Sequence, residues 1–433
     1  MKIDHPSWSY NTNIYEVNVR QYTAEGTFQA FEKHLPRLKD MGIEVLWFMP
    51  ITPISVKGRK GSLGSYYAIQ NYTDINSEFG SLKDFIDIVK YAHHLGFKII
   101  VDWVANHTGN DNVWIAEHPD FFCYDESKQI VHPSGWEDVS KLDYENQQMQ
   151  LAMIDAMKFW VTVCDIDGFR CDMAHLVPLD FWKKAKSELQ RSKEDLFWLA
   201  ECEEPNYHEV FDATYTWKWM HATEEFCKRQ TVLSSLVEVL MEYELGFDKE
   251  AFRVYFTSNH DENSWNGTEY EKYGDAAKAL AVFSCTWTGI PMIYSGQELP
   301  NNKRLHFFDK DQIEWRPECE LHIFYKTLLH LRKKNTALRA ADSSVATHKV
   351  KTNIDDKTFA FVKYNEEDAV FVILNLSSET IDVLPVFDGI DHVLEGPFIN
   401  VYAKEEINIS EVKNIELQAW DYRVFEKKKP LRI

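Results

Sequence analysis

The chain has 433 residues, of which 45% are hydrophobic and 27% are charged, a composition typical of a soluble globular protein larger than one average domain. Its formal net charge of −21 disfavours nucleic acids and anionic membranes as partners, because both are negatively charged. A neutral ligand is indifferent to this charge, and the oligomeric state is left open.

The N-terminal segment and the cysteines bear on the cellular location. Residues 1–8 contain no apolar stretch of the kind that a secretory signal needs. The seven cysteines are odd in number and scattered, and no two of them form a Cys-x-x-Cys pair. Such a pattern is typical of reduced thiols. We therefore expect a cytoplasmic protein whose cysteines serve as small packing residues.

Eight short apolar runs are typical of buried strands, and segments with helical periodicity separate most of them. In chain order the runs are residues 14–19, 45–51, 98–104, 166–172, 196–200, 211–215, 254–257 and 290–294. The first expected helix ends at Gly42 and buries one face, made of Phe28, Phe31, Leu35, Leu38 and Met41. A second helix is expected to begin at Ser81. This alternation predicts an α/β protein with an eight-stranded parallel TIM barrel.

Two segments depart from this alternation. Periodicity lapses over residues 108–145, where His-Pro and Ser-Gly pairs break regular structure, and so long a loop inside a barrel is usually functional. After residue 340 the pattern changes to short alternating runs separated by turn residues, which predicts an all-β domain. We expect the barrel in residues 1–107 and 146–340, a short inserted subdomain in 108–145, and a C-terminal β domain in 341–433.

Polar residues collect where the predicted strands end. In chain order they are Asp102, Asn106, His107, Arg170, Asp172, Glu201, His260 and Asp261. A parallel barrel builds its site from residues at the carboxyl ends of its strands. Side chains on a strand alternate, so Arg170 and Asp172 point the same way. An arginine beside a carboxylate favours the ionised form, which makes Asp172 a permanently charged candidate nucleophile.

The order of these fragments resembles the four sequence regions of the α-amylase family, glycoside hydrolase family 13. Two further matches are the segment from Tyr66-Tyr67-Ala68 to residues 76–80, and residues 289–298. The resemblance covers about residues 14–315. It implies a retaining glycosidase that acts on an oligosaccharide or polysaccharide such as maltodextrin or starch.

Glycoside hydrolysis gives its carboxyl groups separate tasks. Asp172 suits the nucleophile, and Glu201 suits the general acid, because desolvation at the end of an apolar strand favours a protonated carboxyl. Asp261 would stabilise the oxocarbenium-like sugar. The resemblance implies the same three catalytic roles, and it assigns substrate contacts to Tyr67, His107, Arg170 and His260. We expect the carboxyl groups of Asp172 and Glu201 to lie about 5–5.5 Å apart, the retaining geometry.

Two departures from the family pattern concern the substrate and calcium. His175-Leu176 stand where many endo-amylases have Lys-His. Lys141 stands where those enzymes have an aspartate that helps to bind calcium, and a lysine is electrostatically wrong there because calcium takes oxygen ligands. We expect no required cofactor and no calcium at the usual family site, and we leave calcium elsewhere open. The segment 141–143 is closer to that of neopullulanase and cyclomaltodextrinase relatives, which favours malto-oligosaccharide substrates.

Three functions are compatible with these observations. The leading interpretation is a retaining hydrolase of α-glucosidic bonds that works through a covalent glycosyl-Asp172 intermediate. An α-glucan transglycosylase or sugar isomerase of the same family would differ in what captures that intermediate. A catalytically inactive sugar-binding relative is disfavoured because all three acids are present. The sequence leaves open the linkage preference and the choice between endo and exo attack.

Overall fold

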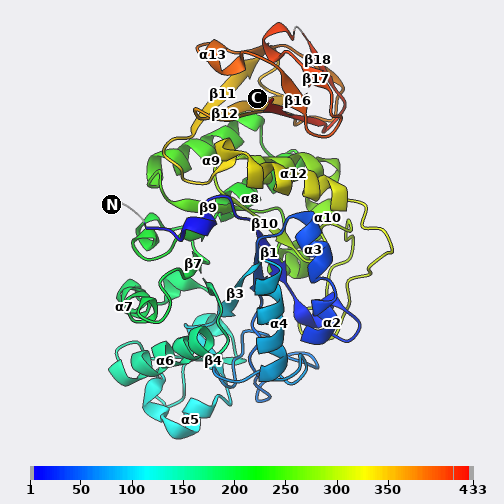
Figure 1. Ribbon diagram of the computed structural model, residues 1–433. Coiled ribbons are helices and arrows are strands. Elements are labelled where there is room, and N and C mark those ends of the chain that lie inside the picture. Colours follow the sequence, from blue (N-terminus) through cyan, green and yellow to red (C-terminus); the bar gives the residue numbers. More distant parts are fainter. Residues whose placement is uncertain (1–3, 413, 429–433) are drawn as a thin grey trace.

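The barrel is closed. The structure, a computed structural model, describes residues 4–412 and 414–428. Residues 1–3, part of the segment considered for a secretory signal, and residues 413 and 429–433 of the expected C-terminal domain lie outside the described residues. Within the described part, eight parallel strands follow the order β1-β10-β9-β8-β7-β6-β3-β2. Helices surround them, and a β-rich region lies beyond α12 (Figure 1). The predicted TIM barrel is confirmed.

Each barrel strand coincides with one of the eight predicted apolar runs. The strands are β1 (Ile14–Val17), β2 (Val45–Phe48), β3 (Lys98–Trp103), β6 (Gly168–Cys171), β7 (Phe197–Ala200), β8 (Ala213–Tyr215), β9 (Phe252–Tyr255) and β10 (Ile290–Tyr294). Almost all of their residues are buried, because helices cover the outside and side chains fill the inside. The boundaries are less well predicted: β9 begins at Phe252, ahead of the run at 254–257.

Helices pack around the strands. They are α1 (Val19–Tyr22), α2 (Phe28–Glu32), α3 (Leu35–Met41), α4 (Leu82–His94), α6 (Gln147–Val163), α7 (Leu179–Gln190), α8 (Trp217–Cys227), α9 (Leu233–Gly246), α10 (Glu269–Tyr273), α11 (Ala277–Thr286) and α12 (His322–Lys334). The start of α4 is fixed as expected, because Ser81 and Asp84 cap each other's backbone N–H groups. Among the described residues, no helix combines the length and the apolar character needed to cross a membrane.

The single helix expected to end at Gly42 is two helices. Lys33 and His34 separate α2 from α3, although both residues keep right-handed helical backbone angles. Pro36 lies in the first turn of α3, and a proline in a helix interior would remove one backbone hydrogen bond and clash with the preceding turn. The expected apolar face survives the break because its residues remain fully buried. Gly42 ends α3 in the left-handed conformation, as predicted.

Strands β6 and β7 approach each other closely at Gly168, which pairs with Phe197. A Cβ atom on Gly168 would lie 2.0 Å from the carbonyl oxygen of Phe197, well inside van der Waals contact. Only glycine fits this position. The close approach matters for the site because the next residues along these two strands lead to Asp172 and Glu201.

The segment between β3 and α6 carries little regular structure. It contains β4 (His107–Gly109), α5 (Val113–Glu117) and β5 (Val139–Lys141). Strands β4 and β5 are antiparallel, with His107 opposite Lys141. The segment therefore returns to the barrel edge, and its last residues lie beside its first ones. Its expected limits at 108 and 145 stay a prediction.

The C-terminal region is built around a seven-stranded sheet with the order β15-β11-β12-β13-β19-β16-β17, with β14 and β18 paired separately. The strands are β11 (Ala346–Thr352), β12 (Thr358–Tyr364), β13 (Ala369–Asn375), β14 (Ile381–Val383), β15 (Pro385–Val386), β16 (Phe398–Asn400), β17 (Glu406–Ile407), β18 (Ile415–Leu417) and β19 (Tyr422–Lys427). The region also holds a short helix, α13 (Asp391–Leu394), which an all-β prediction omits. Phe359 and Phe361 of β12 contact Phe283 of α11 and Trp287, which anchors the sheet to the barrel.

Candidate active site

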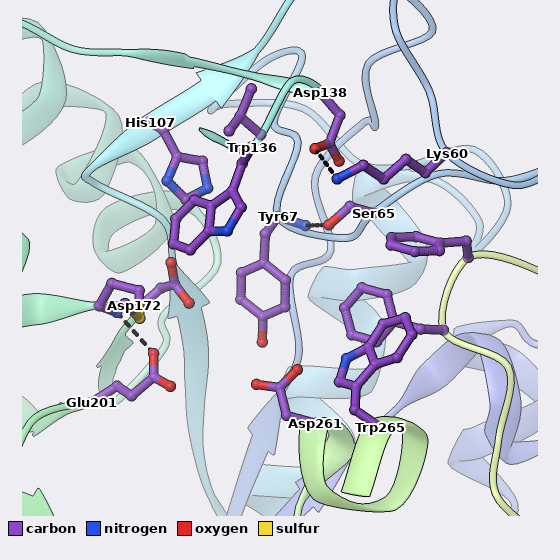
Figure 2. Close-up of a pocket in the computed structure, with 14 residues that line it drawn as sticks. Lys60, Ser65, Tyr67, His107, Trp136, Asp138, Asp172, Glu201, Asp261 and Trp265 are labelled. Atoms are coloured by element: carbon purple, nitrogen blue, oxygen red, sulfur yellow. Dashed lines mark hydrogen bonds and ion pairs between the residues drawn. The ribbon is translucent and has the colours of Figure 1, made fainter. Parts of the chain in front are cut away.

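A pocket of about 240 Å³ lies at the carboxyl ends of the barrel strands (Figure 2). Five predicted site residues line it although they are far apart in the sequence: Tyr67, His107, Asp172, Glu201 and Asp261. The other two, Arg170 and His260, are buried beside them and form ion pairs with these acids. The structure thus brings together all the residues that the sequence predicts for one site.

Arg170 links three strand ends. Its Nη1 atom lies 2.9 Å from Oδ1 of Asp102 and 3.1 Å from Oδ1 of Asp172. Its Nη2 atom lies 3.0 Å from Oε2 of Glu201. The guanidinium is fully buried and lies over the ring of Trp47, at 4.9 Å from its centroid. Arg170 and Asp172 therefore face the same way, as the strand periodicity predicts.

The pKa of Asp172 is shifted in the direction opposite to the expectation. Burial raises the pKa of Asp172 well above its usual range, and the neighbouring Glu201 raises it further, while Arg170 opposes the rise. The expected lowering of this pKa by Arg170 is outweighed, because one guanidinium is shared by Asp102, Asp172 and Glu201 in a buried site.

Glu201 is held in a fixed orientation. Its Oε2 atom accepts a hydrogen bond of 2.8 Å from the backbone N–H of Met173. Met173 has a left-handed backbone (φ 41°), which turns the chain directly after Asp172. The same carboxyl group lies against the guanidinium of Arg170. One hydrogen bond and one ion pair thus hold the same oxygen of Glu201.

Tyr67 stands at the centre of the pocket (Figure 2), and buried residues outside the pocket lining bind its hydroxyl. Its hydroxyl donates to Oδ2 of Asp102 at 3.1 Å and accepts from Nε2 of His260 at 2.8 Å. Trp47 donates to the same Asp102 oxygen. Asp102 is therefore a buried acceptor, as its place at a strand end predicts. These bonds fix the plane of the Tyr67 ring, which a stacking platform for a sugar requires.

His260 and Asp261 carry opposite charges. Burial alone would lower the pKa of His260, but Asp261 and Glu16 outweigh burial and raise that pKa well above its usual range. Burial acts to raise the pKa of Asp261, but the positive charges of His260 and Arg170 outweigh it, so this pKa is lowered. Asp261 is thus an ionised carboxylate at the pocket surface, suited to stabilise positive charge on a sugar ring.

His107 is a neutral hydrogen-bonding group. Burial lowers the pKa of its imidazole to about 4. Its Nδ1 atom lies 3.2 Å from the side-chain amide of Asn106. The amide N–H donates in this pair, so Nδ1 accepts and the proton of the ring is carried by Nε2. A hydrogen bond to the backbone of Tyr67 further orients this neutral ring.

The residues of the usual family calcium site can be located. Lys141 is exposed on β5, and Asn106 is buried and contacts His107. Within residues 4–412 and 414–428, no three His, Cys, Asp or Glu side chains are grouped as a metal site would require. The expectation about calcium nevertheless stays a prediction.

Several lining residues were not singled out from the sequence. Trp136 and Asp138 come from the segment before β5, Lys60 from the loop after β2, and aromatic side chains from two further loops: Trp265, Phe307 and Phe308. Trp265 lies on a π-helical turn, Glu262–Asn266, directly after Asp261. A supply of aromatic residues at 14% of the chain was the only sequence signal for them, because their loops carry no periodic pattern.

The comparison with family models decides the family. The model described as "Alpha amylase, catalytic domain" matches residues 9–139 and 123–314, which is more than half of the chain. The chain belongs to the α-amylase family. The match covers the barrel and the segment inserted after β3, and it ends before the C-terminal sheet of this family member.

Solved amylase structures are similar along nearly the whole chain. A maltogenic alpha-amylase, AmyB, from Thermotoga neapolitana has a TM-score of 0.85 and 29% sequence identity, covering 96% of each chain. An alpha-amylase from Lactobacillus plantarum has a TM-score of 0.86 and 27% identity, covering 97% of this chain and 99% of that one. The alpha-amylase MalA of Haloarcula japonica is 28% identical over 413 residues, or 90% of this chain. This chain spans only 59% of the length of MalA.

Proposed function

We propose that the protein is a retaining glycoside hydrolase that cleaves α-glucosidic bonds in malto-oligosaccharides or starch-like α-glucans. The observation that carries this proposal is the placement of Asp172 and Glu201 on the two terminal nitrogens of one buried guanidinium, at the base of an aromatic-walled pocket. A nucleophile and a general acid on either side of one bond need this proximity. Similarity to a maltogenic alpha-amylase supports the substrate class.

In the first step, Glu201 donates its proton to the glycosidic oxygen while the carboxylate of Asp172 attacks the anomeric carbon. The bond between that carbon and the leaving oxygen breaks, and an ester bond to Asp172 forms. The reaction requires a protonated Glu201 and an ionised Asp172. Substrate binding favours this state, because a glycosidic oxygen beside Glu201 accepts a hydrogen bond from the protonated acid.

In the second step, Glu201, now ionised, removes a proton from water as the water oxygen attacks the anomeric carbon. The ester bond breaks, Asp172 is released as a carboxylate, and Glu201 is protonated again. Two inversions at one carbon retain its configuration. Asp261 stabilises the positive sugar of both transition states, Tyr67 supports the ring by stacking, and His107 and His260 bind its hydroxyl groups.

The test is product analysis with maltoheptaose, run beside pullulan and trehalose. We expect hydrolysis of maltoheptaose, with products released in the α configuration by NMR during the first turnovers. Products longer than the substrate would identify a transglycosylase, because a sugar hydroxyl would then replace water in the second step. Conversion of a disaccharide without hydrolysis would identify an isomerase. Binding of maltoheptaose with no turnover would contradict the proposal.

We also infer that the protein works in a reducing compartment such as the cytoplasm. All seven cysteines are free thiols, and four of them are buried: Cys164, Cys171, Cys202 and Cys285. Burial raises the pKa of Cys171, which flanks the candidate nucleophile, well above its usual range. This supports a packing role for that thiol rather than a reactive one.

A further inference from the structure

Residues 56–63, here named the crossing segment, are fastened to the segment inserted after β3. The backbone N–H groups of Val56 and Lys57 donate to Oδ2 of Asp111 at 2.9 and 3.2 Å. The ammonium of Lys60 lies 2.7 Å from Oδ1 of Asp138, whose side chain is only 7% exposed. These contacts hold one side of the crossing segment against the inserted segment.

The same eight residues are fastened on their other side to the loop after β10. The backbone N–H and the hydroxyl of Ser62 both donate to Oδ1 of Asp309, at 2.8 and 2.6 Å. The N–H of Leu63 donates to the carbonyl of Phe308 at 2.9 Å. At Gly61 the backbone is left-handed, and a Cβ atom would lie 2.5 Å from that of Phe308. The crossing segment therefore spans the space between two loops on different sides of the pocket.

This span lies at the edge of the pocket away from the acids. Figure 2 shows the ion pair of Lys60 and Asp138 at one border of the pocket, with Asp172 and Glu201 at the opposite border. Asp138 acts electrostatically on His107, which binds the sugar on the glycone side in the proposed mechanism. The leaving group departs beside Glu201, so the crossing segment lies where the non-reducing end of the substrate extends.

The space between this border and the acids is small. The pocket volume of about 240 Å³ is below the range of roughly 300–1,000 Å³ that is usual for ligand pockets. Passage of a longer glycone would require the Lys60–Asp138 pair to separate, leaving a largely buried carboxylate without its partner.

We propose that the crossing segment closes one side of the cleft, the side toward which the non-reducing end of the glucan points. The ion pair of Lys60 and Asp138 holds the segment in this position. The enzyme then accepts a glycone of only one or two glucose units, and it shortens malto-oligosaccharides from their non-reducing end. This inference rests on the proposed function and names its mode of attack.

The first experiment uses the wild-type chain and maltoheptaose with a fluorescent label on its reducing end. We expect labelled maltohexaose or maltopentaose as the first labelled product. A second substrate carries a bulky acetal on its non-reducing glucose, and we expect its hydrolysis to be many-fold slower. Equal rates for the two substrates, or labelled glucose and maltose as first products, overturn the closure at this end. Absence of any hydrolysis contradicts the proposed function instead.

The second experiment tests the ion pair with two separate variants, Lys60→Ala and Asp138→Asn. We expect the end-blocked substrate to be hydrolysed several-fold faster than by the wild type, with longer unlabelled products. The control is Lys357→Ala, which removes an ion pair with Glu379 in the C-terminal sheet and should leave the product pattern unchanged. Melting temperatures identify the variants that fold. Folded variants of both residues with the wild-type product pattern overturn the role of the ion pair.

Discussion

His208 should make the fold sensitive to mild acid. It lies on the 3-10 turn Pro205–Glu209, which follows Glu201, and only 7% of it is exposed. Its Nε2 atom bonds to the hydroxyl of Thr214. Burial lowers the pKa of His208 from 6.5 to about 4. Between these values the unfolded chain binds the proton and the folded chain does not, so the free energy of unfolding falls as the pH decreases from 6.5 to 4.

The magnitude follows from the two pKa values. A decrease of the pKa from 6.5 to about 4 lowers the free energy of unfolding by about 3.4 kcal/mol. This full loss is reached only below pH 4. At pH 5 the unfolded imidazole is almost fully protonated and the folded one is mostly neutral. About 2 kcal/mol of stability is therefore already lost relative to pH 7.5.

The assay is urea unfolding at pH 7.5 and pH 5, followed by tryptophan fluorescence. His208→Gln retains an amide near Thr214 but cannot be protonated, so it should lose about 2 kcal/mol less between the two pH values than the wild type. His94→Gln, at an exposed position of α4, is the matched control and should follow the wild type. Equal pH dependence of His208→Gln and the wild type would refute the reasoning.

Four further predictions concern the site. Asp172→Asn and Glu201→Gln should each lower kcat on an unactivated maltodextrin by at least about 10²–10⁴-fold with unchanged circular dichroism; near-wild-type turnover would exclude the assigned roles. In a crystal structure of the enzyme the two carboxyl groups should lie about 5–5.5 Å apart, and a separation near 9 Å would indicate inversion. Trp265→Ala should raise KM for maltoheptaose several-fold, because its half-exposed ring forms part of the pocket wall, and should also lower kcat, because its side chain hydrogen-bonds Asp261; an unchanged KM would argue against a wall role. Dialysis against a chelator should leave the melting temperature and turnover unchanged, because Lys141 stands at the usual family calcium position; losses that calcium restores would show a structural calcium.

The strands and acids could be predicted because one physical pattern marks them. Each barrel strand is buried on both faces, so most of its residues are apolar, and polar residues near its last positions mark the open end of the barrel. Glu201 after β7 and Asp261 after β9 were found in this way. The boundary between α2 and α3 was missed because their apolar face is continuous across Lys33 and His34.

The pocket walls could not be predicted for a different reason. Trp136, Trp265 and Phe308 lie on loops, whose paths depend on tertiary contacts rather than on local periodicity. The raised pKa of Asp172 was missed because the sequence shows its neighbour Arg170 but hides the two other carboxylates that share the same guanidinium. A sequence pattern within one strand does not reveal which charged residues of neighbouring strands lie next to it in the folded protein.

Gly168 helps to set the distance between Asp172 and Glu201, although it takes no part in the reaction. No side chain there contacts a sugar, yet the absence of one allows β6 to lie against the carbonyl of Phe197 on β7. The residues that these two strands carry to the barrel rim are the candidate nucleophile and the candidate acid. A methyl group at position 168 would push β6 away from β7. The distance between the two carboxyl groups would then change, although neither reacting residue had been substituted.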